Sequence, residues 1–437
     1  MGGYIPMARC EQEEMLAELG LSKMEDLFTE VPKELLAAPL EMPKGKSEYE
    51  VRRIMEDFGR DNKIFKTCFR GAGAYRHYAP AIAKHVSAKE TFLTAYTPYQ
   101  AEISQGGLQA IFEFQTDICV LTGMDISNAS VYDGATAAAE AIVMCRERKR
   151  EKALIYSNCN PDTLSVAETY CKCQDIPYEI LPAKDGLVDK ELLKEKLDET
   201  VSCVLVQSPN YYGMFEGVEE VSEIAHAAGA KVIHSGNPIA MAIINSPGEM
   251  GADIAVGEAQ PLGLSLAYGG PYLGYMACRE ALMRRLPGRI VGQTVDENGE
   301  RCFVLTMQAR EQHIRREKAS SSICSNQALC ALAASAYIAS MGPEGLRCVA
   351  QQCYDKAHYA AQRLEEVGYK RRHQGEFFHE FLTECPPGPE QVLQKLEAEG
   401  ILGGLAVDGG ILWCCTEMNT RAEINRMVAI CEEVALI

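Results

Sequence analysis

The stretch ALIYSNCNPDTLSVAETYCKCQDIPYEILP, residues 153–182, decides the fold of this chain. Its apolar run at Ala153–Ser157 predicts a buried strand, and the pattern at Tyr178–Pro182 predicts a second one. A helical segment near 161–173 lies between them. A strand, a helix and a strand in succession are typical of parallel strands that are joined by a right-handed crossover.

The same alternation continues toward the C-terminus. Further strands are predicted at Cys203–Gln207, Lys231–His234, Ile254–Val256 and Gly274–Cys278, and further helices near 189–197 and 218–228. We therefore expect an α/β large domain over residues 71–330 with a mostly parallel sheet. The chain has 437 residues, of which 47% are hydrophobic, so it is long enough for two or three domains around a large core.

The two ends of the chain have other patterns. Residues 1–70 predict a helical arm, because EQEEMLAELG has an apolar face that ends at Gly20, and Ser47-x-x-Glu50 forms a capping box before a second amphipathic run. Residues 331–437 alternate helices and strands with antiparallel character, which predicts a smaller α+β domain. Residues 71–110 are expected to be irregular, because small residues and tyrosines dominate there.

Composition bounds the function. The net charge of −18 argues against a nucleic-acid binder, because affinity for phosphate backbones needs clustered Lys and Arg. No run reaches eighteen apolar residues and the start has no apolar signal core, so we expect neither a membrane span nor secretion. The 18 cysteines are scattered without a Cys-x-x-Cys pair, which favours buried, reduced thiols in a cytoplasmic protein and predicts no metal site.

The segment YDGATAAAEA, residues 132–141, places small residues before a helix. Such a start lets backbone N–H groups approach an anion at the positive end of the helix, as in many α/β enzymes that hold a cofactor phosphate. Plain close packing of a helix start predicts the same residue types, so this signal is weak by itself.

A tyrosine loop, TAYTPYQAEISQG at residues 94–106, concentrates polar and aromatic groups. Tyr96 and Tyr99 combine an aromatic face with a hydroxyl group, which suits interfaces and planar ligands. The other candidate site residues of this loop are Thr97, Glu102 and Ser104. The alternative is a loop whose tyrosines pack on the core of their own chain.

A basic segment, residues 310–322, stands out in an otherwise acidic chain. Arg310, His313 and Lys318 lie within nine residues, next to serines, and this pattern suits a carboxylate or a phosphate. The alternative is a solvated helix face on which Glu311 and Glu317 pair with the cations.

The loop GEAQPLG after Val256 lies where α/β proteins carry their chemistry, at the end of a predicted strand. It offers Glu258 and Gln260, but no Lys, Cys or Ser–His pair. The sequence therefore presents an active-site position without a reactive residue.

Together these segments resemble one family. The motifs GAGAY, TAYTPYQAEISQG, ASVYDGATAAAEA, GEAQPLGLSLAYGGPYLG, LPGRIVGQT and REQHIRREKASSSICSNQAL are similar to the N-terminal half of glycine dehydrogenase (decarboxylating), the pyridoxal-phosphate component of the glycine cleavage system. The resemblance runs from residue 4 to about 330. It implies the aspartate-aminotransferase-like fold, or PLP-dependent fold type I, whose dimers have their active sites at the subunit interface.

The resemblance also implies that one half or subunit carries the Schiff-base lysine and that the other completes the site. Here no Lys occurs between Lys231 and Lys318, so Gln260 stands in the loop where the lysine is expected. HSGNP, residues 234–238, has no Asp for the pyridine nitrogen, and Asn160 replaces the residue that stacks on the cofactor ring. The implied pyridoxal 5′-phosphate is therefore covalent on a partner subunit, with none covalent on this chain.

The implied activity is that of a non-lysine-bearing subunit of glycine decarboxylase, one of two separate subunits in the bacterial form. With its lysine-bearing partner, in a heterotetramer, it would decarboxylate glycine, release carbon dioxide and pass the aminomethyl group to the lipoyl-carrying protein. Tyr96 and Tyr99 would line the partner's glycine or cofactor pocket. Arg310, His313 and Lys318 would supply positive charge for a phosphate or a carboxylate.

Two alternatives stay open at this point. A self-sufficient pyridoxal-phosphate enzyme of the same fold would need a lysine that this sequence does not place in the expected loop. A catalytically silent scaffold or regulatory subunit would use the tyrosine loop for assembly only.

Overall fold

The computed structural model describes residues 8–36, 41–307, 312–319 and 321–436. The chain divides into two compact units, Met1–Ile64 and Phe65–Ile437. The smaller unit contains the helices α1 (Arg9–Glu18) and α2 (Glu48–Arg60) and the short 3-10 helices η1 (Met24–Phe28) and η2 (Lys33–Leu35). The predicted domain boundaries at residues 70 and 330 remain predictions.

The predicted capping box begins α2. The Glu50 N–H donates to Ser47 Oγ at 3.3 Å, and the Ser47 N–H donates to Glu50 Oε2 at 2.8 Å. The apolar face of α2 is exposed within its unit, since Val51, Met55 and Phe58 are all accessible to solvent.

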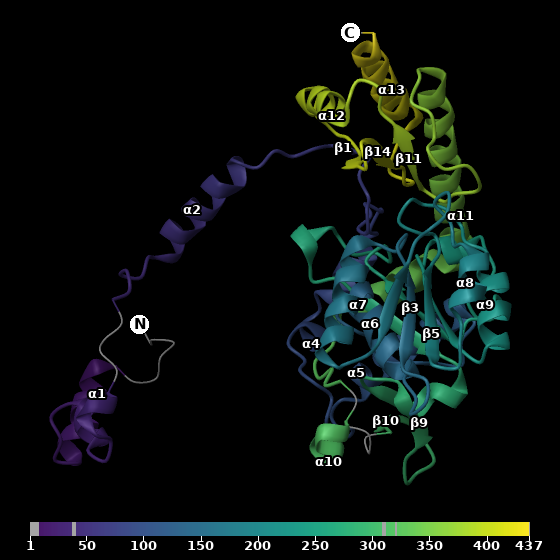
Figure 1. Ribbon diagram of the computed structural model, residues 1–437. Coiled ribbons are helices and arrows are strands. Elements are labelled where there is room, and N and C mark those ends of the chain that lie inside the picture. Colours follow the sequence, from purple (N-terminus) through teal and green to yellow (C-terminus); the bar gives the residue numbers. More distant parts are fainter. Residues whose placement is uncertain (1–7, 37–40, 308–311, 320, 437) are drawn as a thin grey trace. The chain divides into compact units, whose positions relative to one another are not determined.

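The larger unit is built on a seven-stranded sheet with the order β2-β8-β7-β6-β5-β3-β4. Two of its strands, β3 and β5, are labelled in Figure 1. Its strands are β2 (Ile126–Ser127), β3 (Lys152–Tyr156), β4 (Tyr178–Leu181), β5 (Val201–Gln207), β6 (Lys231–Ser235), β7 (Ile254–Glu258) and β8 (Gly274–Cys278). From β4 through β7 all neighbours are parallel, whereas β8 runs antiparallel to both β7 and β2. The six longer strands confirm the predicted ones to within one or two residues.

Helices cover both faces of this sheet, because strand side chains alternate between the faces. One core joins Leu154, Val204 and Val232 to α3 (Ala81–Ser87), α5 (Gln105–Thr122), α8 (Lys190–Lys196), α9 (Val218–Ala227) and α11 (Ala328–Glu366). The other core joins Ile155 and Leu205 to α6 (Gly134–Cys145) and α7 (Pro161–Cys173). The structure therefore confirms the predicted α/β architecture.

The segment 71–110 is less irregular than predicted, because it contains α3, α4 (Glu90–Leu93) and the start of α5. Short 3-10 helices connect other elements: η3 (Ala240–Ala242), η4 (Ala267–Gly269) and η5 (Glu280–Arg285). After η5 the antiparallel pair β9 (Ile290–Val295) and β10 (Arg301–Thr306) packs against α5, and then come α10 (Gln312–Arg315) and η7 (Arg316–Lys318).

The C-terminal part forms a separate small layer around Trp413. A three-stranded antiparallel sheet contains β11 (Glu380–Glu384), β14 (Gly410–Cys414) and β13 (Leu405–Val407). Beside it lie α12 (Pro389–Ala398), α13 (Arg421–Ala435) and the two-stranded pair of β1 (Thr67–Cys68) with β12 (Ile401–Leu402). The long helix α11 breaks at Gly342, where φ is +61° before Pro343, and it packs against both α5 and α13.

Among the described residues, no helix combines the length and the apolar character that crossing a bilayer requires.

Candidate functional site

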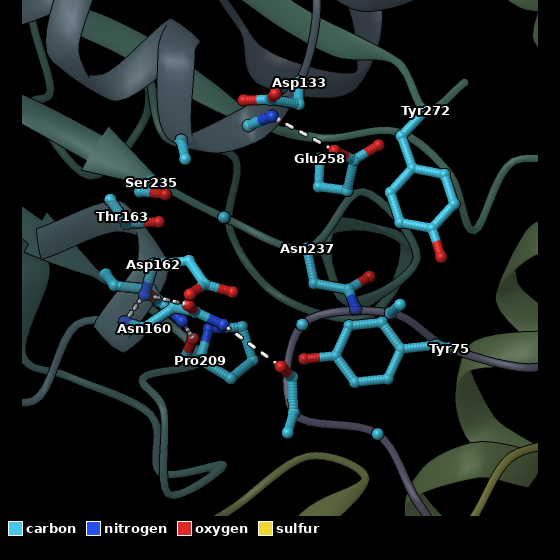
Figure 2. A pocket seen from close by; sticks show the side chains of 18 of the residues that line it. Tyr75, Asp133, Asn160, Asp162, Thr163, Pro209, Ser235, Asn237, Glu258 and Tyr272 are labelled. Atoms are coloured by element: carbon cyan, nitrogen blue, oxygen red, sulfur yellow. Dashed lines mark hydrogen bonds between the residues drawn. The ribbon is translucent and has the colours of Figure 1, made fainter. Parts of the chain in front are cut away.

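A cavity of about 560 Å³ opens at the carboxyl ends of the parallel strands, where α/β proteins bind their ligands. It is lined by the ends of β5, β6 and β7, by the N-terminal ends of α6 and α7, and by residues 71–75 (Figure 2). His379 and Glu380 close it from the C-terminal part of the chain. The loop GEAQPLG, which the sequence analysis singled out, contributes Glu258 to this lining.

The N-terminus of α6 already has an acidic partner, which is the side chain of Glu258. The Gly134 N–H donates to Glu258 Oε2 at 3.1 Å, and the N–H groups of Gln260 and Leu273 donate to Oε1 at 2.8 and 2.9 Å. Asp133 caps the same helix by accepting a hydrogen bond from the Thr136 N–H at 2.7 Å. The small residues of YDGATAAAEA thus allow the close packing that was one interpretation of this segment, and the Gly134 N–H is bound by a side chain of the same chain.

Gln260, at the position where the resemblance places the lysine, does not line the cavity. Its amide Oε1 accepts a hydrogen bond from the Tyr75 N–H at 2.9 Å, and its Nε2 donates to the Tyr75 carbonyl at 3.0 Å and to the Leu264 carbonyl at 2.8 Å. The side chain is fully buried. It is therefore a clamp on the backbone of Tyr75 rather than a group directed at a ligand.

The two other positions flagged by the sequence do line the cavity. Asn160 caps α7 by accepting a hydrogen bond from the Asp162 N–H at 2.8 Å, and its Nδ2 donates to the Ala72 carbonyl at 3.2 Å. At the end of β6, Ser235 and the two residues that follow it, Gly236 and Asn237, line the cavity without an aspartate among them. Both positions thus carry neutral side chains.

The charges that face the cavity are acidic. Asp133, Asp162, Glu258 and Glu380 line it, and none of the described lining residues is a lysine or an arginine. Glu380 accepts hydrogen bonds from the Ala72 N–H at 2.6 Å and from the Tyr75 hydroxyl at 2.7 Å. Burial raises the pKa of both Glu258 and Glu380 to about 7, although their hydrogen bonds act in the opposite direction.

These residues do not fit pyridoxal 5′-phosphate. The lining offers no amine for a Schiff base, and the helix N-terminus that suits a phosphate is bound to the Glu258 carboxylate. A dianionic phosphate would also meet the carboxylates of Asp133 and Asp162, and like charges repel.

None of the predicted site residues that the structure describes, which are Tyr96, Thr97, Tyr99, Glu102 and Ser104, lines this cavity. In the tyrosine loop, Tyr96 is 76% exposed, Tyr99 is 61% exposed, and Glu102 is also exposed. Thr97 and Ser104 are half-buried, and Ser104 precedes α5 without a side-chain cap. The role predicted for these residues remains a prediction.

Tyr99 meets two residues that the sequence reasoning did not select. Its hydroxyl lies 3.4 Å from Cys324 Sγ, and Arg289 Cζ lies 5.1 Å from the centre of its ring. Arg289 is buried, and its Nη2 lies 3.6 Å from Cys324 Sγ. In the sequence, Arg289 and Cys324 are marked only by their position within two of the quoted family motifs, LPGRIVGQT and REQHIRREKASSSICSNQAL.

Arg310 and the side chains of His313 and Lys318 lie outside the described residues. In the described part of the basic segment, the side chains of Arg315 and Arg316 are exposed. The role predicted for this segment remains a prediction.

Comparisons with known proteins agree on one family. The family profile described as "Glycine cleavage system P-protein" matches residues 2–431. A probable glycine dehydrogenase (decarboxylating) subunit 1 from Moorella thermoacetica is 48% identical over 436 residues, which cover 98% of each chain. The protein of the same name from Carboxydothermus hydrogenoformans is 47% identical over 438 residues, again with 98% of each chain covered.

Solved structures give the same result. An inhibitor-bound crystal structure of glycine decarboxylase (P-protein) of the glycine cleavage system aligns with a TM-score of 0.93 at 38% identity, covering 99% of this chain and 100% of the other. A sphingosine-1-phosphate lyase from Burkholderia pseudomallei, with a TM-score of 0.67 at 14% identity over 92% and 93% of the two chains, shares the fold alone. The fold expected from the resemblance, PLP-dependent fold type I, is thereby confirmed.

Proposed function

The chain belongs to the glycine cleavage system P-protein family, and on this premise we propose that it is the non-lysine-bearing subunit of a glycine decarboxylase. With a lysine-bearing partner subunit it decarboxylates glycine, releases carbon dioxide and passes the aminomethyl group to the lipoyl-carrying protein. Pyridoxal 5′-phosphate, covalent on the partner, supplies the electron sink for this reaction.

The observation that carries this proposal is the side chain at position 260. A glutamine stands where the family's lysine is expected, and its amide group forms hydrogen bonds with the backbone of Tyr75 and Leu264. The cavity beside it has no cation among its described lining residues. A chain built in this way needs another subunit for amine chemistry.

The contribution of this chain then lies in the tyrosine loop. Two exposed aromatic side chains on one loop suit a partner's pocket, because each combines an apolar ring with a hydroxyl group. In the proposal Tyr96 and Tyr99 line the partner's glycine or cofactor pocket, next to Thr97, Glu102 and Ser104. Arg310, His313 and Lys318 add positive charge for a phosphate or a carboxylate.

The assembly that follows is a heterotetramer of two such chains and two lysine-bearing subunits. It works in the cytoplasm, the compartment that suits a chain with 18 free cysteines. The lipoyl-carrying protein delivers the acceptor of the aminomethyl group to this assembly.

The test is reconstitution. We expect the purified chain alone to be inactive in glycine–bicarbonate exchange and to become active with a lysine-bearing subunit. Borohydride treatment with pyridoxal 5′-phosphate should leave a reduced adduct on an active-site lysine of the partner only. A stoichiometric adduct on one lysine of this chain would overturn the assignment.

Point variants separate a contributing subunit from a silent scaffold. Tyr96→Ala should reduce exchange by the assembled enzyme at least about tenfold without changing the mass of the complex. The matched control is Tyr78→Ala, since Tyr78 is 61% exposed outside the tyrosine loop. Loss of assembly with unchanged activity of the remaining complex would favour the scaffold.

A further inference from the structure

The connection between Glu258 and the start of α6 is a feature that the proposed function does not need. Glu258 is the last residue of β7, and its carboxylate turns back to the first helical residue, Gly134, 124 positions earlier (Figure 2). Its second oxygen accepts hydrogen bonds from the N–H groups of Gln260 and Leu273. One carboxylate thus joins α6, the loop after β7 and the start of β8.

The start of α6 also has no spare room on this side. A Cβ built on Gly134 would lie 2.7 Å from the backbone nitrogen of Glu258, and one on Gly274 would lie 2.3 Å from the carbonyl oxygen of Asp133. The helix start therefore rests directly on β7 and β8. The anion that it binds comes from the strand underneath it.

We propose that Glu258 is a built-in replacement for a cofactor phosphate, which keeps phosphorylated cofactors out of this chain's cavity. The helix α6 has twelve residues. Its N-terminus can bind an anion, because the first N–H groups of a helix lack intrahelical acceptors. Here a covalently attached carboxylate takes that position without the entropy loss of binding a separate molecule. An arriving phosphate would have to displace it, next to Asp133.

The proposal rests on the proposed function only in treating this cavity as the counterpart of the family's cofactor site. It goes further, because a chain without a lysine could still bind the cofactor non-covalently. With Gln260 in place of a lysine, the chain cannot bind the cofactor covalently. With Glu258 at the start of α6, it also lacks a free site for the phosphate. These are two separate losses with separate tests.

The experiment is a calorimetric titration of the full-length chain with pyridoxine 5′-phosphate. This probe carries the ring and the phosphate, but it has no aldehyde and so forms no imines with surface lysines. Pyridoxine, which lacks the phosphate, is titrated in parallel. We expect no saturable binding of either compound by the unmodified chain in the millimolar range.

Glu258→Ala should bind pyridoxine 5′-phosphate at least about tenfold more tightly than the unmodified chain, with no gain for pyridoxine. Asp162→Asn is the matched control, because it removes a negative charge from the same cavity away from α6, and it should gain nothing. Where Glu258→Ala does not fold, Glu258→Gln serves, since it removes the negative charge from the start of α6 and keeps the shape of the side chain.

Three results would overturn the proposal. One is saturable phosphate-dependent binding by the unmodified chain, and another is an equal gain in Asp162→Asn. The third is a folded Glu258→Ala or Glu258→Gln variant without any gain. Each leaves the reconstitution test untouched, because activity on the partner's lysine does not depend on this cavity.

Discussion

Arg289 lies against the ring of Tyr99, with its Cζ 5.1 Å from the ring centre, and both side chains contact Cys324 Sγ. This contact links the tyrosine loop to the start of β9 through a buried guanidinium group. An exposed tyrosine that is held from below in this way keeps one orientation at little entropic cost.

Arg289→Ala should therefore weaken the assembled enzyme through Tyr99. We expect glycine–bicarbonate exchange to fall by about tenfold, and Arg289→Lys, which retains the cation, to fall less. Arg421→Ala is the control, because it removes the same kind of contact elsewhere in the chain. Arg421 Cζ lies 5.2 Å from the centre of the Tyr359 ring in the C-terminal part. Equal losses in the two alanine variants would show a general effect on stability, which thermal unfolding of each variant would reveal.

Cys324 should be an unusually reactive thiol. The Tyr99 hydroxyl and the Arg289 guanidinium lower its pKa, whereas burial raises the pKa of nearby Cys330. At pH 7.5 iodoacetamide should alkylate Cys324 several-fold faster than Cys330, as measured by peptide mass spectrometry over time. Tyr99→Phe should slow only Cys324; an unchanged rate in that variant contradicts the assignment.

The free energy of unfolding should decrease as the pH rises from 4.5 to 8, because of the buried carboxyl group of Glu380. Its pKa is about 7 in the folded chain and about 4.5 when unfolded, because burial disfavours the charged form. In that window the folded state binds more protons than the unfolded state, so the free energy of unfolding decreases as pH rises. The full effect is on the order of 3 kcal/mol.

Urea unfolding at pH 5, 6, 7 and 8 measures this effect. Glu380→Gln should flatten the decrease, and so should Glu258→Gln, whose carboxyl is shifted in the same direction. Asp198→Asn should not flatten it, because hydrogen bonds from the Thr200 hydroxyl and N–H lower the pKa of Asp198. A Glu380→Gln variant with the pH profile of the unmodified chain would refute the shift.

Gln260→Lys should not restore a cofactor-binding amine. The substitution removes an acceptor for the Tyr75 N–H and places a charge in a fully buried position, so we expect a loss of about 2–4 kcal/mol in the free energy of unfolding. Gln293→Lys, at an exposed position on β9, should cost little. Borohydride reduction with pyridoxal 5′-phosphate followed by mass spectrometry should find no adduct at position 260.

The main sheet could be predicted because its longer strands are short apolar runs, and those from β3 to β6 are separated by helices with their own spacing. Lys152–Tyr156 and Gly274–Cys278 are legible from residue types alone. The direction of β8 is not, because the sequence between Glu258 and Gly274 does not reveal whether the chain reverses or crosses over. The pair β9–β10 was not predicted either, although most of its residues are apolar and only four of the twelve are exposed.

The candidate site could be predicted only in part. Local patterns located the helix start at Gly134 and the loop after β7, but the bond between them joins positions 134 and 258. Tyr99, Arg289 and Cys324 are likewise brought together from three distant segments. Spacing rules describe neighbours in one element, so such contacts appear only when the chain is folded.

Gln260 and Glu258 also bear on how such a chain can evolve. A single codon change that reinstates lysine at 260 breaks the clamp on Tyr75 and still leaves a carboxylate at the start of α6. Autonomy would need several substitutions at once, and the first of them is expected to be harmful. These two side chains therefore make dependence on a second subunit easier to acquire than to lose.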